Sequence, residues 1–388
     1  MKNIFSQIRF PIKRKTDSRA ARGYHAYRGE KRPVRCLTWL CLAVLFFLLE
    51  RGIWLTAGHF PAAGAFLRRI GQAVSAWLSR LCGILPVPVN EWLIGLALAL
   101  LLFLFVRTLI RRDRAALGRG VCCLLALVSL CNFLFMASYK VQHTAPSLAS
   151  RLGLEVRECS PEELETFILY AAQQCCELAE QVPRDADGTC DFGDFRPISE
   201  KIHREYAVLA EVYPVFDTVR PAPVKQSFLG GRIMSRVNLS GYFFPWTGEC
   251  IVSTDTVQSH IPFDIAHEEA HALGIGPEAE CNYCAWLLCQ GSEDVRFRYS
   301  GWLNAFIYAD NAYYALGKSI GKDRLSPAVR HDLQVLSEMV HRFDGPLNDA
   351  GTAVNDAFIK STGQSDGIRS YGRAVDLLLA HFYSYMQE

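Results

Sequence analysis

The sequence of 388 residues has no excess of either charge, because 41 lysines and arginines are balanced by 39 aspartates and glutamates. The net charge of +2 argues against a nucleic-acid-binding protein, which would present a strongly basic surface. Internal repeats and low-complexity tracts are also lacking, which excludes a solenoid or a biased, unfolded chain. The chain is too long for one ordinary domain, so at least two structural units are expected.

Acidic residues are scarce in the first 35 positions, where only Asp17 and Glu30 accompany eleven lysines and arginines. A basic run directly before an apolar segment is typical of a cytoplasmic flank, and a nucleic-acid arm is the less favoured alternative. No small-residue cleavage site follows the apolar segment, so a signal peptide is not expected. Residues 1–35 are therefore predicted to be a basic cytoplasmic tail.

Three segments are apolar enough to span a bilayer, which requires about 20 residues. They cover residues 36–56, 92–110 and 121–138. Glu50 and Arg51 interrupt the first span, and we expect them near the outer interface or paired with each other.

The loops between these spans predict the orientation of the chain. The loop after the second span carries five arginines, whereas the loop before it carries three. Because basic loops remain in the cytoplasm, the N-terminus is expected inside the cell. The predicted protein is a multi-pass protein of the cell membrane, in contact with lipid, with a membrane domain at residues 36–139 and an extracytoplasmic domain at residues 140–388.

Residues 65–85, in the loop between the first two spans, have apolar side chains at helical spacing with arginines between them. This pattern predicts an amphipathic helix that lies on the outer membrane surface, and an ordinary loop helix is the alternative. The fourteen cysteines do not resolve into a disulfide framework. Exported thiols could pair, or an organism living without oxygen could leave them reduced.

The outer domain is predicted to be α+β, with a small antiparallel-type sheet before a helix-rich half. Ser160, Pro161 and Glu163 form a capping-box pattern at the start of a helix. A second helix is expected over residues 197–211. Short β-prone runs punctuated by glycines then follow, at 224–229, 233–237, 241–244 and 250–253.

The most informative motif is His-Glu-Glu-Ala-His at residues 267–271. Histidines at positions i and i+4 lie on one helix face, where both imidazoles can bind one zinc ion. Glu268 would then act as the general base toward a water molecule. We expect this helix to begin near Pro262 and to end at Gly274.

A third ligand is predicted at Glu278, which follows a Gly-Pro turn and begins the next helix. Glu280 is the competing third ligand, but it would point about 200° away on that helix. Asn282, one turn beyond Glu278, is placed to orient a ligand from behind. Cys281 and Cys284 leave open a closed structural site made with the two histidines, although core packing also explains them.

The β-prone run after Gly241 has a predicted role in substrate binding. An edge strand beside the metal helix can hold a peptide by strand addition. The candidates for that strand are Glu249, Cys250, Ile251 and Val252. An ordinary core strand is an equally favoured alternative.

The chain after residue 36 resembles an uncharacterised family of bacterial three-span membrane proteins with a zincin-like, gluzincin-type outer domain. The resemblance is carried by the three spans and by motifs at residues 241–249, 267–271, 274–282, 299–301 and 370–373. Family members usually have Ala where this chain has Cys281. The wider zincin clan implies zinc at His267 and His271, Glu268 as general base and a carboxylate third ligand. Tyr299 is a further candidate, either as a hydroxyl that stabilises the oxyanion or as a packed aromatic.

These observations predict a membrane-anchored zinc peptidase with an outward-facing site. The alternative is a non-catalytic membrane sensor or scaffold that has the same fold, with or without a structural zinc site. A peptide or protein substrate is expected in the first case, and neither case predicts nucleic acid as a partner.

Overall fold

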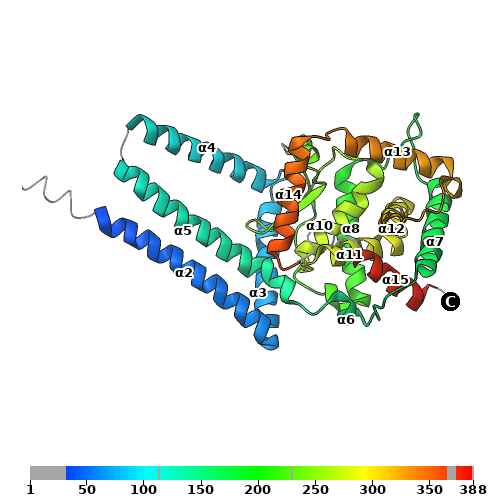
Figure 1. The fold of residues 1–388 in the computed structure, drawn as a ribbon, viewed down its shortest axis with the longest axis horizontal. Helices are drawn as coiled ribbons and strands as arrows, with labels where there is room; N and C mark the ends of the chain where they lie inside the picture. Colours follow the sequence, from blue (N-terminus) through cyan, green and yellow to red (C-terminus); the bar gives the residue numbers. More distant parts are fainter. Residues whose placement is uncertain (1–31, 112–113, 229, 365–372, 387–388) are drawn as a thin grey trace, which may run out of the picture.

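The computed structural model describes residues 32–111, 114–228, 230–364 and 373–386. Most of the basic tail predicted at residues 1–35 and most of the motif at 370–373 therefore lie outside the described residues. The fold is rich in helices, and it consists of a long apolar bundle attached to a compact helical body (Figure 1).

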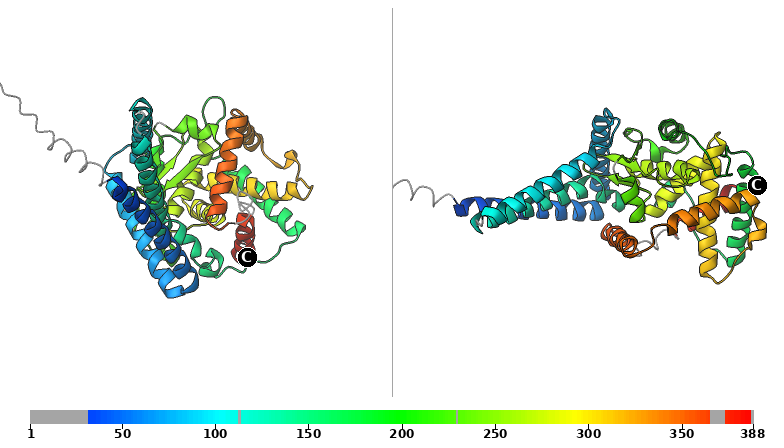
Figure 2. Two further views of the ribbon diagram at one scale, coloured as in Figure 1. Left: turned by 60° about the vertical axis from the view of Figure 1, so that its left-hand side comes forward. Right: turned by 90° about the horizontal axis from the view of Figure 1, so that it is seen from above.

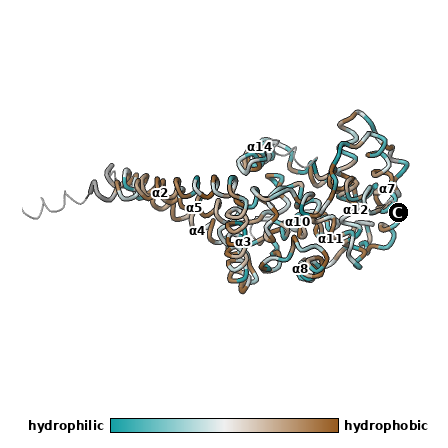
Figure 3. The backbone as a smooth tube through the Cα atoms, turned by 90° about the horizontal axis from the view of Figure 1, so that it is seen from below, coloured by the Kyte–Doolittle hydropathy of each residue, from teal (hydrophilic) through white to brown (hydrophobic). Residues whose placement is uncertain are grey.

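The three predicted apolar spans are confirmed as helices long and apolar enough to cross a membrane, so the chain is a multi-pass membrane protein. They are α2 (Arg32–His59), α4 (Val89–Arg111) and α5 (Arg114–Ser138). Helices α2 and α5 pack along each other, with the rings of Phe46 and Phe133 5.9 Å apart. Helix α4 diverges from them toward the compact body (Figure 1), and the tube of all three helices is predominantly apolar (Figure 3).

Helix α3 (Pro61–Gly83) crosses the end of the bundle, where the bundle meets the compact body (Figures 1 and 2). Its apolar row is exposed and comprises Phe66, Ile70, Val74, Trp77 and Leu81. Its opposite face is buried and made of small and polar residues: Gly64, Gly71, Gln72, Ser75, Ala76 and Ser79. Gly64 and Gly71 of this face lie against the backbones of α2 and α5, at Ala57 and Ala137. The helix predicted at residues 65–85 is therefore present and has an exposed apolar face, and its place on the membrane surface stays a prediction.

The small-residue face of α3 lets the compact body approach its backbone closely. Gly248 lies at the tip of a hairpin with a φ of 67°, and an added Cβ would fall 2.1 Å from the carbonyl oxygen of Ser75. Gln72 donates hydrogen bonds to the carbonyls of Val219 and Ala272, at 2.6 and 3.1 Å. Helix α3 thus packs on the body as well as on the apolar helices α2 and α5.

Two parts of the body follow the membrane helices in the chain. The first consists of the short helices η1 (Lys140–Thr144) and α6 (Leu148–Leu152), followed by α7 (Pro161–Ala179), α8 (Phe195–Val212) and η2 (Pro214–Phe216). The second contains η3 (Gln258–His260), α10 (Ile261–Ala272), α11 (Glu278–Gly291), α12 (Val295–Ala315), η4 (Lys322–Arg324), α13 (Pro327–His341), α14 (Pro346–Ser361) and α15 (Arg373–Tyr385). The predicted capping box is present at the start of α7, where Ser160 accepts from the Glu163 amide and Glu163 accepts from the Ser160 amide.

Helix α11 lies at the centre of the body, between α10 and α12. Almost every residue from Ala279 to Cys289 is buried, so the helix has no polar face toward solvent. Cys281, Cys284 and Cys289 are fully buried free thiols within this core. They pack as small apolar side chains.

The sheet is small, as predicted, but mixed rather than purely antiparallel. It has the order β1 (Lys225–Gln226), β3 (Glu249–Val252), β2 (Gly241–Phe244), and β1 pairs in parallel with β3 whereas β2 pairs antiparallel. Residues 233–236 of the β-prone run at 233–237 are instead helical, in α9 (Gly231–Arg236). Local β propensity gave way there to the environment in the fold, where Met234 is buried and the Ser235 hydroxyl donates to the distant carbonyl of Asp255 as well as to that of Gly231.

Candidate metal centre

The helix that carries the histidines begins and ends close to the predicted residues. Pro262 occupies the first turn of α10, where its missing N–H costs no hydrogen bond. Gly274 ends the helix with a φ of 94°, and the amide of Ile275 donates back to the carbonyl of Ala270. This turn directs the chain into α11, so that Glu278 faces the histidines from the first turn of that helix.

The structure brings together the three predicted ligands. One donor atom from each of His267, His271 and Glu278 lies within 4.8 Å of the others. The Glu278 carboxylate is 3.2 Å from Nε2 of His267 and 3.5 Å from Nε2 of His271. Ligands bound tetrahedrally to zinc at 2.0–2.1 Å are separated by about 3.3 Å, so these residues fit a zinc ion.

Each imidazole is oriented by a bond to its other nitrogen. Nδ1 of His267 is 2.7 Å from Oδ1 of Asn282, and Nδ1 of His271 is 3.0 Å from the carbonyl oxygen of Ile275. Since both partners are acceptors, each ring donates through Nδ1 and is fixed with its Nε2 atom facing Glu278. Asn282 therefore lies where the sequence predicted, behind a ligand.

The pKa values of the two carboxylates at the cluster, Glu278 and Glu268, are shifted in opposite directions. Burial alone would raise the pKa of Glu278, but the two imidazoles hold that pKa well below its usual range. The burial of Glu268 raises its pKa to about 8, because the nearby His271 offsets that burial only in part. Among the described residues, Oε2 of Glu268 is buried without a hydrogen-bond partner. A buried, unpartnered carboxylate beside three ligands is positioned to exchange protons with a group bound in the cavity.

The competing ligands have other partners. Glu280 accepts a hydrogen bond of 2.8 Å from the amide of Leu148, so it anchors the start of α6. The thiol of Cys281 lies 3.3 Å from Nδ1 of His271, on the side of the ring away from Glu278. Cys281 thus cannot share one ion with the Nε2 atoms, and the closed site with Cys281 and Cys284 is not formed.

Tyr299 lies away from the cluster. Its hydroxyl donates to the carboxylate of Asp332, which is also bound bidentately by Arg184 at 2.8 Å. Tyr308 faces the site instead, with its hydroxyl 3.3 Å from Oδ1 of Asn282. The two tyrosines are separated by about two and a half turns of α12, so they lie on opposite faces. Tyr299 is therefore a buried core residue.

The strand predicted as the substrate edge is the central strand of the sheet. β3 pairs with β2 along its whole length and with β1 at Ile251 and Val252, so it is not the edge strand that was predicted to bind a peptide. The Glu249 carboxylate accepts hydrogen bonds from the amides of Val89 and Asn90 and pairs with Lys225. These contacts cap α4 and make Glu249 structural. The strand next to the metal cluster is β2, which pairs only with β3 among the described strands.

A cavity of about 1020 Å³ contains the cluster. Glu268, the three ligands and residues of β2 line it, together with side chains that sequence reasoning missed: Tyr139, Asp264, Asn304, Tyr308, Val354 and Phe358. Asp264 is one turn before His267 on α10, and its burial raises its pKa to about 7. Its position three residues before His267, on the same face of the helix, was the signal in the sequence that could have identified Asp264. The other residues come from α12, α14 and the end of α5, which only the tertiary fold brings to the site.

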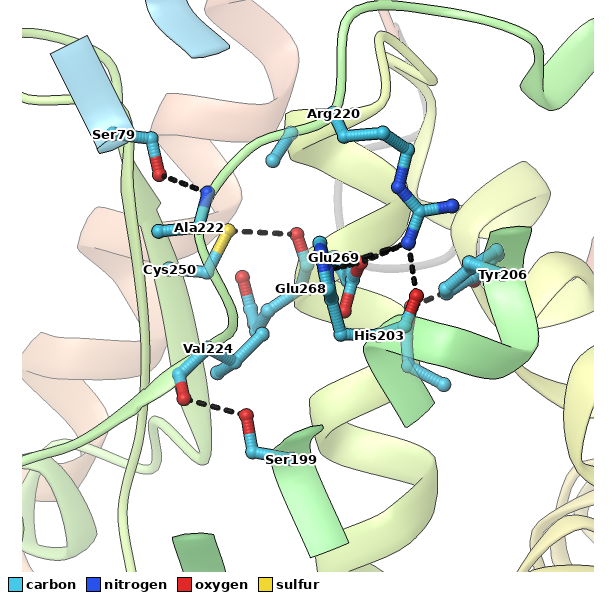
Figure 4. Close-up of polar contacts among 12 residues, drawn as sticks. Ser79, Ser199, His203, Tyr206, Arg220, Ala222, Val224, Cys250, Glu268 and Glu269 are labelled. Carbon is cyan, nitrogen blue, oxygen red and sulfur yellow. Dashed lines mark hydrogen bonds and ion pairs between the residues drawn. The ribbon is translucent and has the colours of Figure 1, made fainter. Parts of the chain in front are cut away.

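The back of α10 explains the charged third residue of the motif. Glu269 is fully buried, and its carboxylate lies 2.6 Å from Nδ1 of His203 on α8 and 3.5 Å from Arg220. Figure 4 shows Arg220 reaching from its loop toward Glu269 and His203. Two carbonyls of α10 also accept hydrogen bonds. The Ala266 carbonyl accepts from the Tyr206 hydroxyl on α8, and the Glu268 carbonyl accepts from the Cys250 thiol on β3. Helix α10 is thus hydrogen-bonded to α8 and β3, and its Glu269 forms an ion pair with Arg220.

Comparison with known proteins gives one result. No curated protein and no solved structure matches the chain at a significant level. A family model described as "Protein of unknown function (DUF3810)" matches residues 66–379, which include most of α3, all of α4 and α5, the sheet and the whole metal cluster. This agrees with the predicted membership of an uncharacterised membrane-protein family, and the chain belongs to the DUF3810 family.

Proposed function

We propose that the protein is a membrane-anchored, zinc-dependent metallopeptidase. The observation that carries the proposal is the convergence of His267, His271 and Glu278 next to the buried carboxylate of Glu268. This is the donor set of a catalytic zinc site on a zincin-like helix pair, with three protein ligands of nitrogen and oxygen. Zinc held there would supply a Lewis acid to a peptide carbonyl and to the attacking water.

The protein's own residues divide the remaining work. Glu268 takes a proton from the attacking water and returns it to the leaving amine. Asn282 and the Ile275 carbonyl hold the imidazoles in the required tautomer. β2 offers to an extended substrate the edge that does not pair with β3.

We propose that the compact body faces out of the cell. The distribution of arginines supports this orientation, because it favours a cytoplasmic loop between α4 and α5. A reporter that works only outside the cytoplasm should therefore be active when it is fused after Glu388. A reporter active only in the cytoplasm would overturn this orientation.

The test of the function uses the full chain in detergent or nanodiscs. We expect one equivalent of zinc and a peptidase activity that Glu268→Gln reduces about 1000-fold without loss of zinc. Glu280→Gln is the matched control, because it changes a half-buried carboxylate on α11 that lies outside the cluster. Absence of zinc would contradict the proposal. Zinc with activity unaffected by Glu268→Gln would contradict the role of Glu268, and zinc without any activity would favour the non-catalytic sensor or scaffold.

A further inference from the structure

The edge strand β2 and its hairpin run from the cluster of His267, His271 and Glu278 to the membrane-spanning helix α5. β2 begins at Gly241, beside Glu268, and its hairpin continues to Trp246. The indole N–H of Trp246 donates a hydrogen bond of 3.0 Å to the carbonyl of Cys131. Cys131 belongs to the candidate span Ala116–Ser138 and lies about 10 Å along the helix from its end. One end of the hairpin is therefore at the level of the bilayer.

A continuous set of aromatic rings follows the same path. Phe135 on α5 contacts the ring of Trp246 at 6.0 Å and that of Tyr139 at 5.6 Å. Tyr139 in turn contacts Phe243 on β2 at 5.5 Å and His271 at 5.7 Å. Aromatic side chains of this kind are favoured at the boundary between water and lipid. The wall of the cavity is thus continuous with the outer end of a membrane-spanning helix.

Helix α14 forms the opposite wall, and its contact with α5 is also aromatic. Phe358 lies 5.8 Å from the ring of Phe135 and 6.4 Å from that of Tyr139. Leu347, Val354 and Phe358 line the cavity, yet they remain 57, 70 and 42% exposed. Helix α14 stands off from the rest of the body on the side nearest the membrane helices (Figure 3). Exposed apolar side chains on this wall and aromatic rings on the other fit an apolar substrate segment.

The length of β2 limits how far the cluster can be from the membrane. The chain from Gly241 to Trp246 covers at most about 17 Å at about 3.3 Å per residue. A chain paired with β2 therefore reaches the bilayer level within about ten residues of the bond placed at Glu268. A freely diffusing peptide would gain nothing from this arrangement, whereas a chain already held in the bilayer would enter it directly.

We propose that the substrate is a polypeptide anchored in the same membrane, whose extended segment next to the bilayer pairs with β2 and is cut within about ten residues of its anchor. This inference rests on the peptidase function proposed above. The bond broken is a peptide bond, and water supplies the hydroxyl to the new carboxylate and the proton to the new amine.

The probe is a library of mixed-sequence peptides of uniform length, either carried on a Leu-rich membrane span or free in solution. The full chain is reconstituted in vesicles of phosphatidylethanolamine and phosphatidylglycerol, with Glu268→Gln as the blank. We expect the anchored library to be cut at least about tenfold faster than the free library at equal concentration. Cuts should cluster within about ten residues of the span and stay there when the library peptides are doubled in length.

A matched pair of variants tests the role of the hairpin. Trp246→Ala removes the ring contacts and the bond to Cys131, so it should broaden the distribution of cut sites on the anchored library. Trp246→Phe keeps a ring at this position and should broaden the distribution less. Equal rates on the two libraries, or cut sites spread evenly along the anchored one, would overturn the inference and leave the peptidase intact. If zinc-loaded protein cuts neither library, both proposals fail.

Discussion

Gly241 shows how one position without a side chain fixes the geometry of the site. A Cβ added there would lie 2.6 Å from Oε1 of Glu268 and 2.9 Å from its carboxyl carbon. The glycine thus allows the backbone of β2 to lie directly against the proposed general base. Any larger residue must displace the carboxylate or the strand.

We therefore expect Gly241→Ala to lower peptidase activity at least about tenfold while zinc content stays at one equivalent, because the ligands do not contact this residue. Activity and metal analysis of the same preparation measure both quantities. Gly231→Ala is the control, since its added Cβ would meet its nearest neighbour at an ordinary 3.5 Å. Full activity of Gly241→Ala would show that Glu268 can move without consequence.

Asn282 offers a second test at this scale, on the metal rather than on the reaction. Asn282→Ala removes the acceptor that holds Nδ1 of His267, so zinc affinity should fall about 10- to 100-fold. Asn282→Asp keeps an acceptor oxygen and should retain more of the affinity. Competition with a chelator of known affinity measures both variants, and an unchanged affinity for Asn282→Ala would remove Asn282 from the site.

The sequence predicted which three side chains converge but not what surrounds them, and the reason is the range of the interactions. The ligands and Asn282 lie close together in the sequence, on the two consecutive helices α10 and α11, so helical periodicity suffices to place them. Tyr299 and Tyr308 could not be distinguished in this way, because the choice depends on which face of α12 packs against Asn282. That choice is made by contacts far apart in the sequence.

At the scale of elements, α10 is held from behind by a buried charge cluster. Glu269 is compensated by His203 and Arg220, and its removal would leave these basic groups beside a buried gap. We expect Glu269→Ala to lower the free energy of unfolding by about 3 kcal/mol, measured by denaturant titration in detergent. Glu269→Gln retains an acceptor and should cost less. Equal stability of Glu269→Ala and the wild type would mean that the cluster contributes nothing to the position of α10.

Helix α14 is held by few contacts, and its Phe358 ring is the main aromatic contact with α5. Phe358→Ala should therefore speed amide hydrogen exchange across residues 346–361 and leave α10 unchanged. Val354→Ala is the matched control, because that side chain is 70% exposed. Exchange that is equally slow in both variants would show that α14 is held by other contacts.

Elements were predictable where the local pattern agreed with the tertiary environment. The spans and α10 have a clear and uniform pattern, so their existence followed from the sequence. The order of the sheet did not, because β3 became central only when β1, which precedes both β2 and α9 in the chain, paired with it in parallel. Residues 249–252 were therefore assigned an edge that belongs to β2.

At the scale of the whole molecule, the membrane helices and the body are not separable. Glu249 is 2% exposed and relies on the amides of Val89 and Asn90 at the start of α4, while Gln72 of α3 satisfies the Ala272 carbonyl at the end of α10. Composition could not show this, because it marks residue 140 as a boundary between apolar and mixed sequence. The supports of the site lie on both sides of that boundary.

A fragment of residues 140–388 should accordingly fail to fold as the full chain does. It would leave a buried carboxylate without two of its donors, at a cost of about 3 kcal/mol or more, and would expose the surface that α3 covers. We expect no cooperative thermal transition by circular dichroism, whereas the full chain in detergent should melt cooperatively. A fragment that melts at the temperature of the full chain would contradict this interdependence.

The contact between Gly248 and Ser75 has a consequence for how this protein can vary. Surface turns normally accept extra residues and differ in length among relatives. The turn at Gly248 packs directly against the backbone of α3, so the distance between β2 and α3 fixes the length of this turn. The turn at Asp185–Gly188 is largely exposed, and a Cβ added at Gly188 would meet no neighbouring atom. The turn at Asp185–Gly188 should therefore tolerate insertions, affinity tags and natural differences in length, whereas the turn at Gly248 should not.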